Sequence, residues 1–90
     1  MHRNEEFLLR RAAGLTVIVP VGRAAVAFPG MICVNSTGEF LWDLMEKEQT
    51  LEGLTAALTA EYQVDSARAE ADVRAFLDRL AQAGAVEGWA

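Results

Sequence analysis

The amino-acid sequence predicts an α+β domain with a winged helix-turn-helix-like layout, in which a three-stranded antiparallel sheet is followed by three helices. Two observations predict it. The first third of the chain holds short apolar runs rich in β-branched residues, and the remainder holds three apolar stripes at helical spacing, each preceded by a helix-start signal. Because 90 residues without a linker-like segment suffice for one core, we expect residues 1–90 to form a single domain.

The first two strands are expected to form a hairpin. Residues 15–21 alternate between two faces and are rich in valine and isoleucine, which is typical of a strand. Residues 7–11 form a second apolar run, and Gly14 between the two runs favours a turn. Pro20 cannot donate a ladder hydrogen bond, so the strand should end there. Residues 24–28 stay ambiguous between a continuing strand and one helical turn.

The third strand is expected at Met31-Ile32-Cys33-Val34. Four consecutive apolar residues without polar alternation are typical of a short strand with both faces covered. The hairpin would then lie on one side of this strand, and a docking element would lie on the other.

Capping signals place the first two helices. Ser36 with Glu39 three residues later forms a capping box, so replacing Ser36 by alanine should cost about 1 kcal/mol. Thr50 is the expected N-cap of the second helix, where the interior Gly53 costs roughly 0.5–1 kcal/mol relative to alanine. Trp42 lies off the apolar stripe of the first helix, where it either widens the buried face or meets another element.

The third helix is expected between Asp65 as its N-cap and Gly84 at its C-terminal end. Trp89 and Ala90, beyond it, are expected to fray. The inner face of this helix is apolar and comprises Ala69, Val73, Phe76, Leu77 and Leu80.

No catalytic or metal-binding constellation accompanies this layout. The single histidine, His2, lies at an expected mobile terminus, and the single cysteine, Cys33, has no histidine or lysine nearby in sequence that would activate it. One histidine and one cysteine supply no recognised metal-ligand spacing, and no glycine-rich phosphate motif occurs. We therefore expect a protein that is not an enzyme and that carries no cofactor.

The charge pattern argues against nucleic-acid binding. The chain has a net charge of −5, and residues 66–83 carry three arginines against three carboxylates, whereas phosphate binding requires uncompensated cations. The sequence also lacks a signal-peptide core and any apolar run near the ~20 residues of a membrane span. These features predict a cytoplasmic protein that contacts neither nucleic acid nor membrane.

Three patterns of core and cap residues occur in order along the chain. They are Asn35-x-Thr37-Gly38-x-Phe40-Leu41-Trp42, then Thr50…Leu54…Leu58…Glu61-Tyr62-x-Val64, then Asp72-Val73-x-x-Phe76-Leu77-x-x-Leu80…Gly84. In this order and at these spacings they resemble the PqqD-like family of small peptide chaperones and RiPP precursor recognition elements. The resemblance extends from about residue 7 to residue 86.

The resemblance implies a non-catalytic protein that binds the leader of a ribosomally made precursor peptide and presents it to a modifying enzyme, commonly a radical SAM protein. The leader would add a strand to the third strand and lie in a groove beside the third helix. An extended peptide gains main-chain hydrogen bonds at such an edge. Two strand side chains would then face the core and two the groove. The expected leader-binding residues are Met31, Ile32, Cys33 and Val34 on the strand, and Arg68, Asp72, Ala75, Phe76 and Arg79 on the helix.

Several alternatives stay open from the sequence alone. The third strand could be an ordinary buried strand, Phe76 could serve the core only, and Arg68 and Asp72 could form a solvated pair four residues apart. At the level of function, the alternative is a winged-helix nucleic-acid-binding or scaffold protein. An apolar strand edge could also pair with a second copy of the chain, which would make a homodimer.

Overall fold

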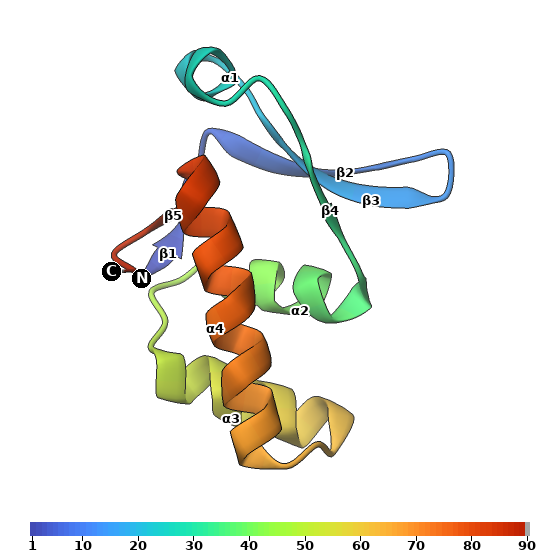
Figure 1. Cartoon of the computed structure of the whole chain (residues 1–90), viewed down its shortest axis with the longest axis vertical. Helices are drawn as coiled ribbons and strands as arrows, with labels where there is room; N and C mark the ends of the chain where they lie inside the picture. Colours follow the sequence, from blue (N-terminus) through green and yellow to red (C-terminus); the bar gives the residue numbers. More distant parts are fainter. Residues whose placement is uncertain (90) are drawn as a thin grey trace.

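The computed structural model describes residues 1–89 and contains two small antiparallel sheets and a group of helices (Figure 1). One sheet has the strand order β2-β3-β4, and the other pairs β1 with β5. The predicted α+β fold, a three-stranded antiparallel sheet followed by three helices, is confirmed. The elements are β1 (His2–Arg3), β2 (Phe7–Ala12), β3 (Leu15–Pro20), α1 (Arg23–Ala27), β4 (Ile32–Val34), α2 (Ser36–Leu44), α3 (Leu51–Tyr62), α4 (Ser66–Ala83) and β5 (Val86–Glu87).

The predicted hairpin is confirmed. β2 and β3 pair from Phe7 with Pro20 to Ala12 with Leu15, so only two residues form the turn. These are Ala13 and Gly14, with φ of 54° and 79°. Two consecutive left-handed residues are the geometry that matches the twist of a tight hairpin. Residues 24–28, which the sequence left ambiguous, fall largely in α1. This short helix connects β3 to β4 and has no buried residues.

Within the chain itself, only one face of β4 is covered. Its residues pair with β3 in the register Thr16–Val34, Val17–Cys33 and Ile18–Ile32. Ile32 is buried, but Cys33 is exposed, and Met31 precedes the strand with 60% of its surface exposed. The run is uniformly apolar although one of its faces is open, and β4 is the edge strand of its sheet.

The predicted start of α2 is wrong by one residue. Asn35, in an extended conformation, is the N-cap, and its side-chain oxygen accepts a 2.9 Å hydrogen bond from the N–H of Gly38. Ser36 is already the first helical residue, and Glu39 pairs with Arg11 of β2 instead of closing a capping box. Asn and Ser are comparable caps, so the choice between two adjacent candidates depends on the backbone turn after β4.

The other helix boundaries agree with the prediction. Thr50 caps α3 by accepting from the N–H of Gly53, at 3.0 Å, and Asp65 caps α4 by accepting from the N–H of Arg68, also at 3.0 Å. Gly84 ends α4 in the left-handed conformation, with φ of 81°.

The core lies between the sheet and the helices α2, α3 and α4. Trp42 is 1% exposed, so it widens the buried face of α2 rather than lying at the surface. The predicted inner face of α4 is confirmed, since all five of its residues are buried. The sheet contributes Phe7, Ile18 and Ile32 to the same cluster.

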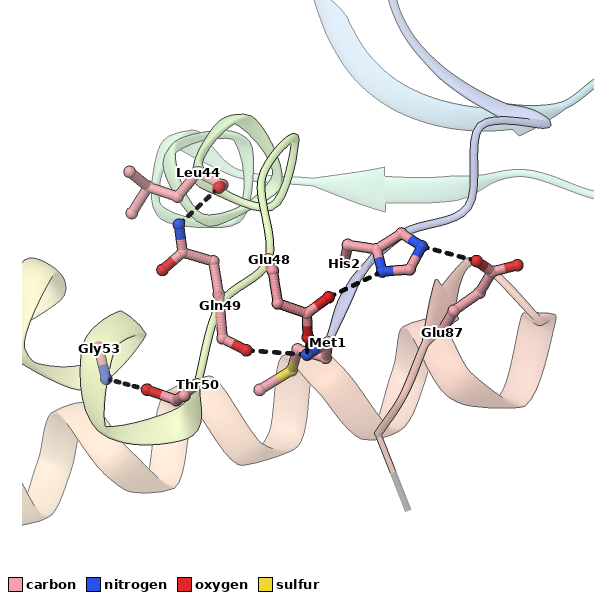
Figure 2. Close-up of polar contacts among 8 residues, drawn as sticks. All are labelled: Met1, His2, Leu44, Glu48, Gln49, Thr50, Gly53 and Glu87. Atoms are coloured by element: carbon pink, nitrogen blue, oxygen red, sulfur yellow. Dashed lines mark hydrogen bonds and ion pairs between the residues drawn. The ribbon is translucent and has the colours of Figure 1, made fainter.

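Both ends of the described chain contact other elements, so the predictions of a mobile His2 and a frayed Trp89 are wrong. Strand β1 pairs with β5 through His2–Glu87 and Arg3–Val86. Figure 2 shows that His2 lies between Glu48 and Glu87, with nitrogen–oxygen distances of 3.2 Å and 2.7 Å. His2 is therefore part of the structure and not a residue of a mobile terminus.

The C-terminal tryptophan is also in place. The Nε1 of Trp89 donates a 2.9 Å hydrogen bond to Asp78 of α4, so the expected fraying does not apply to Trp89. Ala90 lies outside the described residues. The sequence carries no short-range signal for either contact, because each partner lies on a different element.

Candidate functional site

An open groove runs between the free edge of β4 and helix α4. Three adjoining hollows of about 320–350 Å³ each make up this β4–α4 groove, and Arg79 lines all three of them. The other residues that line the groove come from four segments of the chain. These residues are Phe28, Met31, Ile32, Cys33, Val34, Asn35, Thr37, Gly38, Leu41, Arg68, Asp72, Ala75, Phe76, Gln82 and Ala83.

The structure brings together around this groove all nine residues that the sequence singled out. The strand residues line its middle and one end, and the helix residues line the opposite wall. The nine are Met31, Ile32, Cys33, Val34, Arg68, Asp72, Ala75, Phe76 and Arg79. Strand β4 and helix α4 therefore border the same groove, although Val34 and Arg68 are 34 positions apart in the sequence.

The floor of the groove is apolar and closely packed. Phe76 is 8% exposed, so its ring belongs both to the core and to the groove surface. Gly38 lies against it, because a Cβ atom on Gly38 would come within 3.2 Å of Phe76 Cε1 and of Val34 Cβ. The absence of a side chain at Gly38 thus lets the start of α2 approach both β4 and α4.

The backbone of β4 presents hydrogen-bonding groups toward α4. The carbonyl oxygen of Cys33 accepts a 2.9 Å hydrogen bond from Arg79 Nη2. In an antiparallel strand, the N–H and C=O of one residue point to the same side, and successive residues alternate. The N–H of Cys33 therefore also faces α4, while Ile32 and Val34 direct theirs toward β3. An extended segment entering the groove would meet both groups of Cys33.

The charges along α4 are largely compensated. Arg68 Nε lies 3.6 Å from Asp72 Oδ2, and Arg74 Nε lies 3.1 Å from Glu70 Oε2. The Arg68–Asp72 pair that the sequence left as an alternative thus exists, and it lies at one end of the groove.

Some lining residues were not among the predicted ones. Asn35, Thr37, Gly38 and Leu41 line the end nearest α2, and all four belong to the segment that carries the family resemblance. At the other end, Gln82 follows Arg79 by three residues, so helical spacing could have placed it on the same wall. Phe28 had no such signal, because it lies in the segment whose structure the sequence left undecided.

The single histidine and the single cysteine lie on strands of two different sheets. The ring nitrogens of His2 contact Glu48 and Glu87, while Cys33 lies on β4. Within residues 1–89, no group of three or more histidine, cysteine or carboxylate side chains is placed to hold a metal ion. Over the same residues, none of the helices has both the length and the apolarity needed to cross a membrane.

These features define the class of the protein: a small α+β domain whose surface groove joins a free strand edge to a helix. Residues 16–86, most of the chain, match the family model described as coenzyme PQQ synthesis protein D (PqqD). The chain therefore belongs to the PqqD family, as the sequence patterns indicated.

A solved structure supports the same fold. The chain is similar to that of TbiB1 in complex with the TbiA(beta) leader peptide, with a TM-score of 0.78 and 26% sequence identity. The alignment covers 100% of this chain and 99% of the other. No curated protein matches the sequence.

Proposed function

We propose that this protein is a recognition element for a ribosomally synthesised precursor peptide, whose leader it binds in the β4–α4 groove. The observation that carries the proposal is the free edge of β4, with the backbone groups of Cys33 directed into a groove floored by Phe76. Membership of the PqqD family and the likeness to a domain solved with a leader peptide support it.

Binding would proceed by strand addition. The leader would lie antiparallel or parallel to β4 and exchange main-chain hydrogen bonds with Cys33, extending the sheet from three strands to four. Alternate leader side chains would then point toward the apolar floor at Phe76 and Gly38. The main-chain bonds would supply affinity regardless of sequence, and the side-chain contacts would supply selectivity.

We further propose that the protein contributes binding and not bond chemistry. A separate modifying enzyme would act on the core region of the precursor while the leader is held in the groove. A radical SAM enzyme is the partner that the family resemblance implies. The precursor and this enzyme would be the two macromolecular partners of the chain.

The nucleic-acid alternative finds no support in the charges of α4. A winged-helix protein that bound phosphates through this helix would need uncompensated cations on it. Arg68 and Arg74 instead lie beside carboxylates four residues away, and the whole chain has a net charge of −5.

The test is a calorimetric titration with a synthetic peptide covering the leader half of a short precursor encoded beside the gene. We expect binding at micromolar affinity or tighter, lost in a Cys33→Pro variant, because proline removes the N–H that faces the groove. Cys33→Ala is the matched control, since it removes the thiol but keeps that N–H, and it should bind like the original protein. A folded Cys33→Pro variant with unchanged affinity would exclude strand addition at this residue.

A further inference from the structure

Arg79 occupies the position that a docked strand would need. Its Nη2 donates to the carbonyl oxygen of Cys33 at 2.9 Å, from α4 across the groove to β4. That oxygen is the acceptor which Cys33 would offer to the backbone of an added strand. The edge of β4 that faces the groove is therefore covered at Cys33 by a side chain of the protein itself.

The guanidinium of Arg79 also lacks the partner that suits it best. Among residues 1–89, no carboxylate forms an ion pair with Arg79, whereas Arg68 and Arg74 on the same helix each lie beside one. The neighbouring carboxylate of Asp78 accepts instead from Trp89 Nε1, at 2.9 Å. Arg79 is thus an exposed cation in the middle of the groove, held by a neutral carbonyl group.

A carboxylate would be a stronger partner than this carbonyl. Charge-assisted hydrogen bonds are shorter and stronger than those with neutral acceptors, and a guanidinium can bind both carboxylate oxygens at once. The Arg68–Asp72 pair leaves one end of the groove neutral, so Arg79 alone gives the groove centre its charge. The local preference is then for an anionic side chain, although the whole chain is acidic.

We propose that Arg79 is a specificity-determining residue that selects an aspartate or glutamate side chain in the bound leader. The leader carboxylate would draw the guanidinium away from Cys33 and so release the backbone oxygen for pairing with the leader strand. Recognition of the side chain and opening of the strand edge would thus occur together. This inference rests on the proposed function and names the chemistry that the groove would recognise.

The first test uses the protein without any peptide. Carbonyl ¹³C chemical shifts report hydrogen bonding to a carbonyl group, so the Cys33 carbonyl should shift in an Arg79→Gln variant. Arg74→Gln is the matched control, because Arg74 is an exposed arginine of α4 that does not line the groove. A Cys33 carbonyl shift that is the same in Arg79→Gln and in Arg74→Gln would overturn the proposal.

The second test is a double-mutant cycle by calorimetry. The probes are the synthetic leader peptide described above and derivatives in which each Asp or Glu is replaced singly by Asn or Gln. For one of these derivatives, we expect affinity for the original protein and for Arg74→Gln to fall about tenfold, the coupling of a charge pair partly shielded from water. The affinity of Arg79→Gln for this derivative should lie within about twofold of its affinity for the parent peptide.

The outcomes separate this inference from the proposed function. If the leader binds and responds to Cys33→Pro, but no carboxylate replacement depends on Arg79, the selection of an acidic side chain is wrong and leader binding stands. If every carboxylate replacement weakens both proteins equally, the selection is wrong as well. If no leader peptide binds the folded protein, both proposals fall together.

Discussion

Gly38 and Phe76 lie in close contact, so the first turn of α2 packs directly against the floor of the groove. A Cβ atom added to Gly38 would approach Phe76 Cε1 to 3.2 Å, closer than an ordinary van der Waals contact. Gly38 also donates its N–H to the N-cap Asn35, and Asn35 lines the groove. One glycine thereby connects the capping of α2, the packing of Phe76 and the shape of the candidate site.

Replacing Gly38 by alanine should lower the free energy of unfolding by about 1 kcal/mol. Overpacking of a buried site costs roughly 1–3 kcal/mol, and the higher helix propensity of alanine offsets about 1 kcal/mol of that cost. Urea denaturation measures the change. Gly53→Ala is the comparison, because Gly53 holds the same third position of α3 but is exposed. A Cβ atom on Gly53 would also come within 3.2 Å of a neighbour, the Thr50 Oγ1, but this atom belongs to a surface side chain and not to the core. The gain in helix propensity is therefore offset only in part, and we expect a change of less than about 0.5 kcal/mol. Equal effects of both substitutions would contradict the close packing at Gly38.

The identity of the α2 cap leads to a second prediction. Asn35→Ala should lower the free energy of unfolding by about 1 kcal/mol, because the N–H of Gly38 loses its acceptor. Ser36→Ala should change it by less than about 0.5 kcal/mol, since Ser36 is the first helical residue and caps nothing. Thermal or urea denaturation of the two variants decides between them. A larger loss for Ser36→Ala would restore the capping box that the sequence indicated.

The contacts of Glu48 predict a change in the acid stability of the protein. The hydrogen bond from the Met1 ammonium group, followed by that from His2, lowers the pKa of Glu48 below its ordinary value of 4.5 (Figure 2). Because the pKa is lower in the folded state, ionised Glu48 favours folding. This contribution is complete above about pH 4.5 and is lost as the pH falls through the lowered folded-state pKa.

The measurement is the urea midpoint of the original protein and of Glu48→Gln at about pH 6 and about pH 3. The midpoint of Glu48→Gln should fall less over this range, because the variant has no carboxylate to protonate at this position. Glu61→Gln, at an exposed position of α3, provides a comparison and should follow the original protein. Parallel falls of Glu48→Gln and the original protein would show that the contacts of Glu48 do not stabilise the folded state.

The hairpin and the three helices after β4 could be predicted because their signals are local. The turn at Gly14, the caps at Thr50 and Asp65 and the stop at Gly84 are each decided by a few neighbouring residues. The cap of α2 was wrong by one position because Asn35 and Ser36 are both suitable residues. Only the backbone direction after β4 distinguishes them.

The groove was predictable in composition but not in geometry. Helical spacing places Asp72, Ala75, Phe76 and Arg79 on or beside one face of α4, and the family patterns point to β4. Neither the spacing nor the patterns predict that Arg79 bonds the carbonyl of Cys33, because 46 residues separate them. The pairing of β1 with β5 was also missed, because two-residue strands carry no periodic pattern and these two lie at opposite ends of the chain.

The sequence by itself determined the order of the hairpin, the third strand and the three helices after it, the apolar faces of these helices and the family. Periodicity, capping and spacing are properties of neighbouring residues. Only the tertiary structure decided which face of β4 is open, which backbone groups of Cys33 point into the groove and which arginine covers them. These features depend on the register of β4 on β3 and on the placement of α4 beside that edge. Both arise from contacts between residues far apart in the chain, and the pattern of side chains within one segment does not predict such contacts.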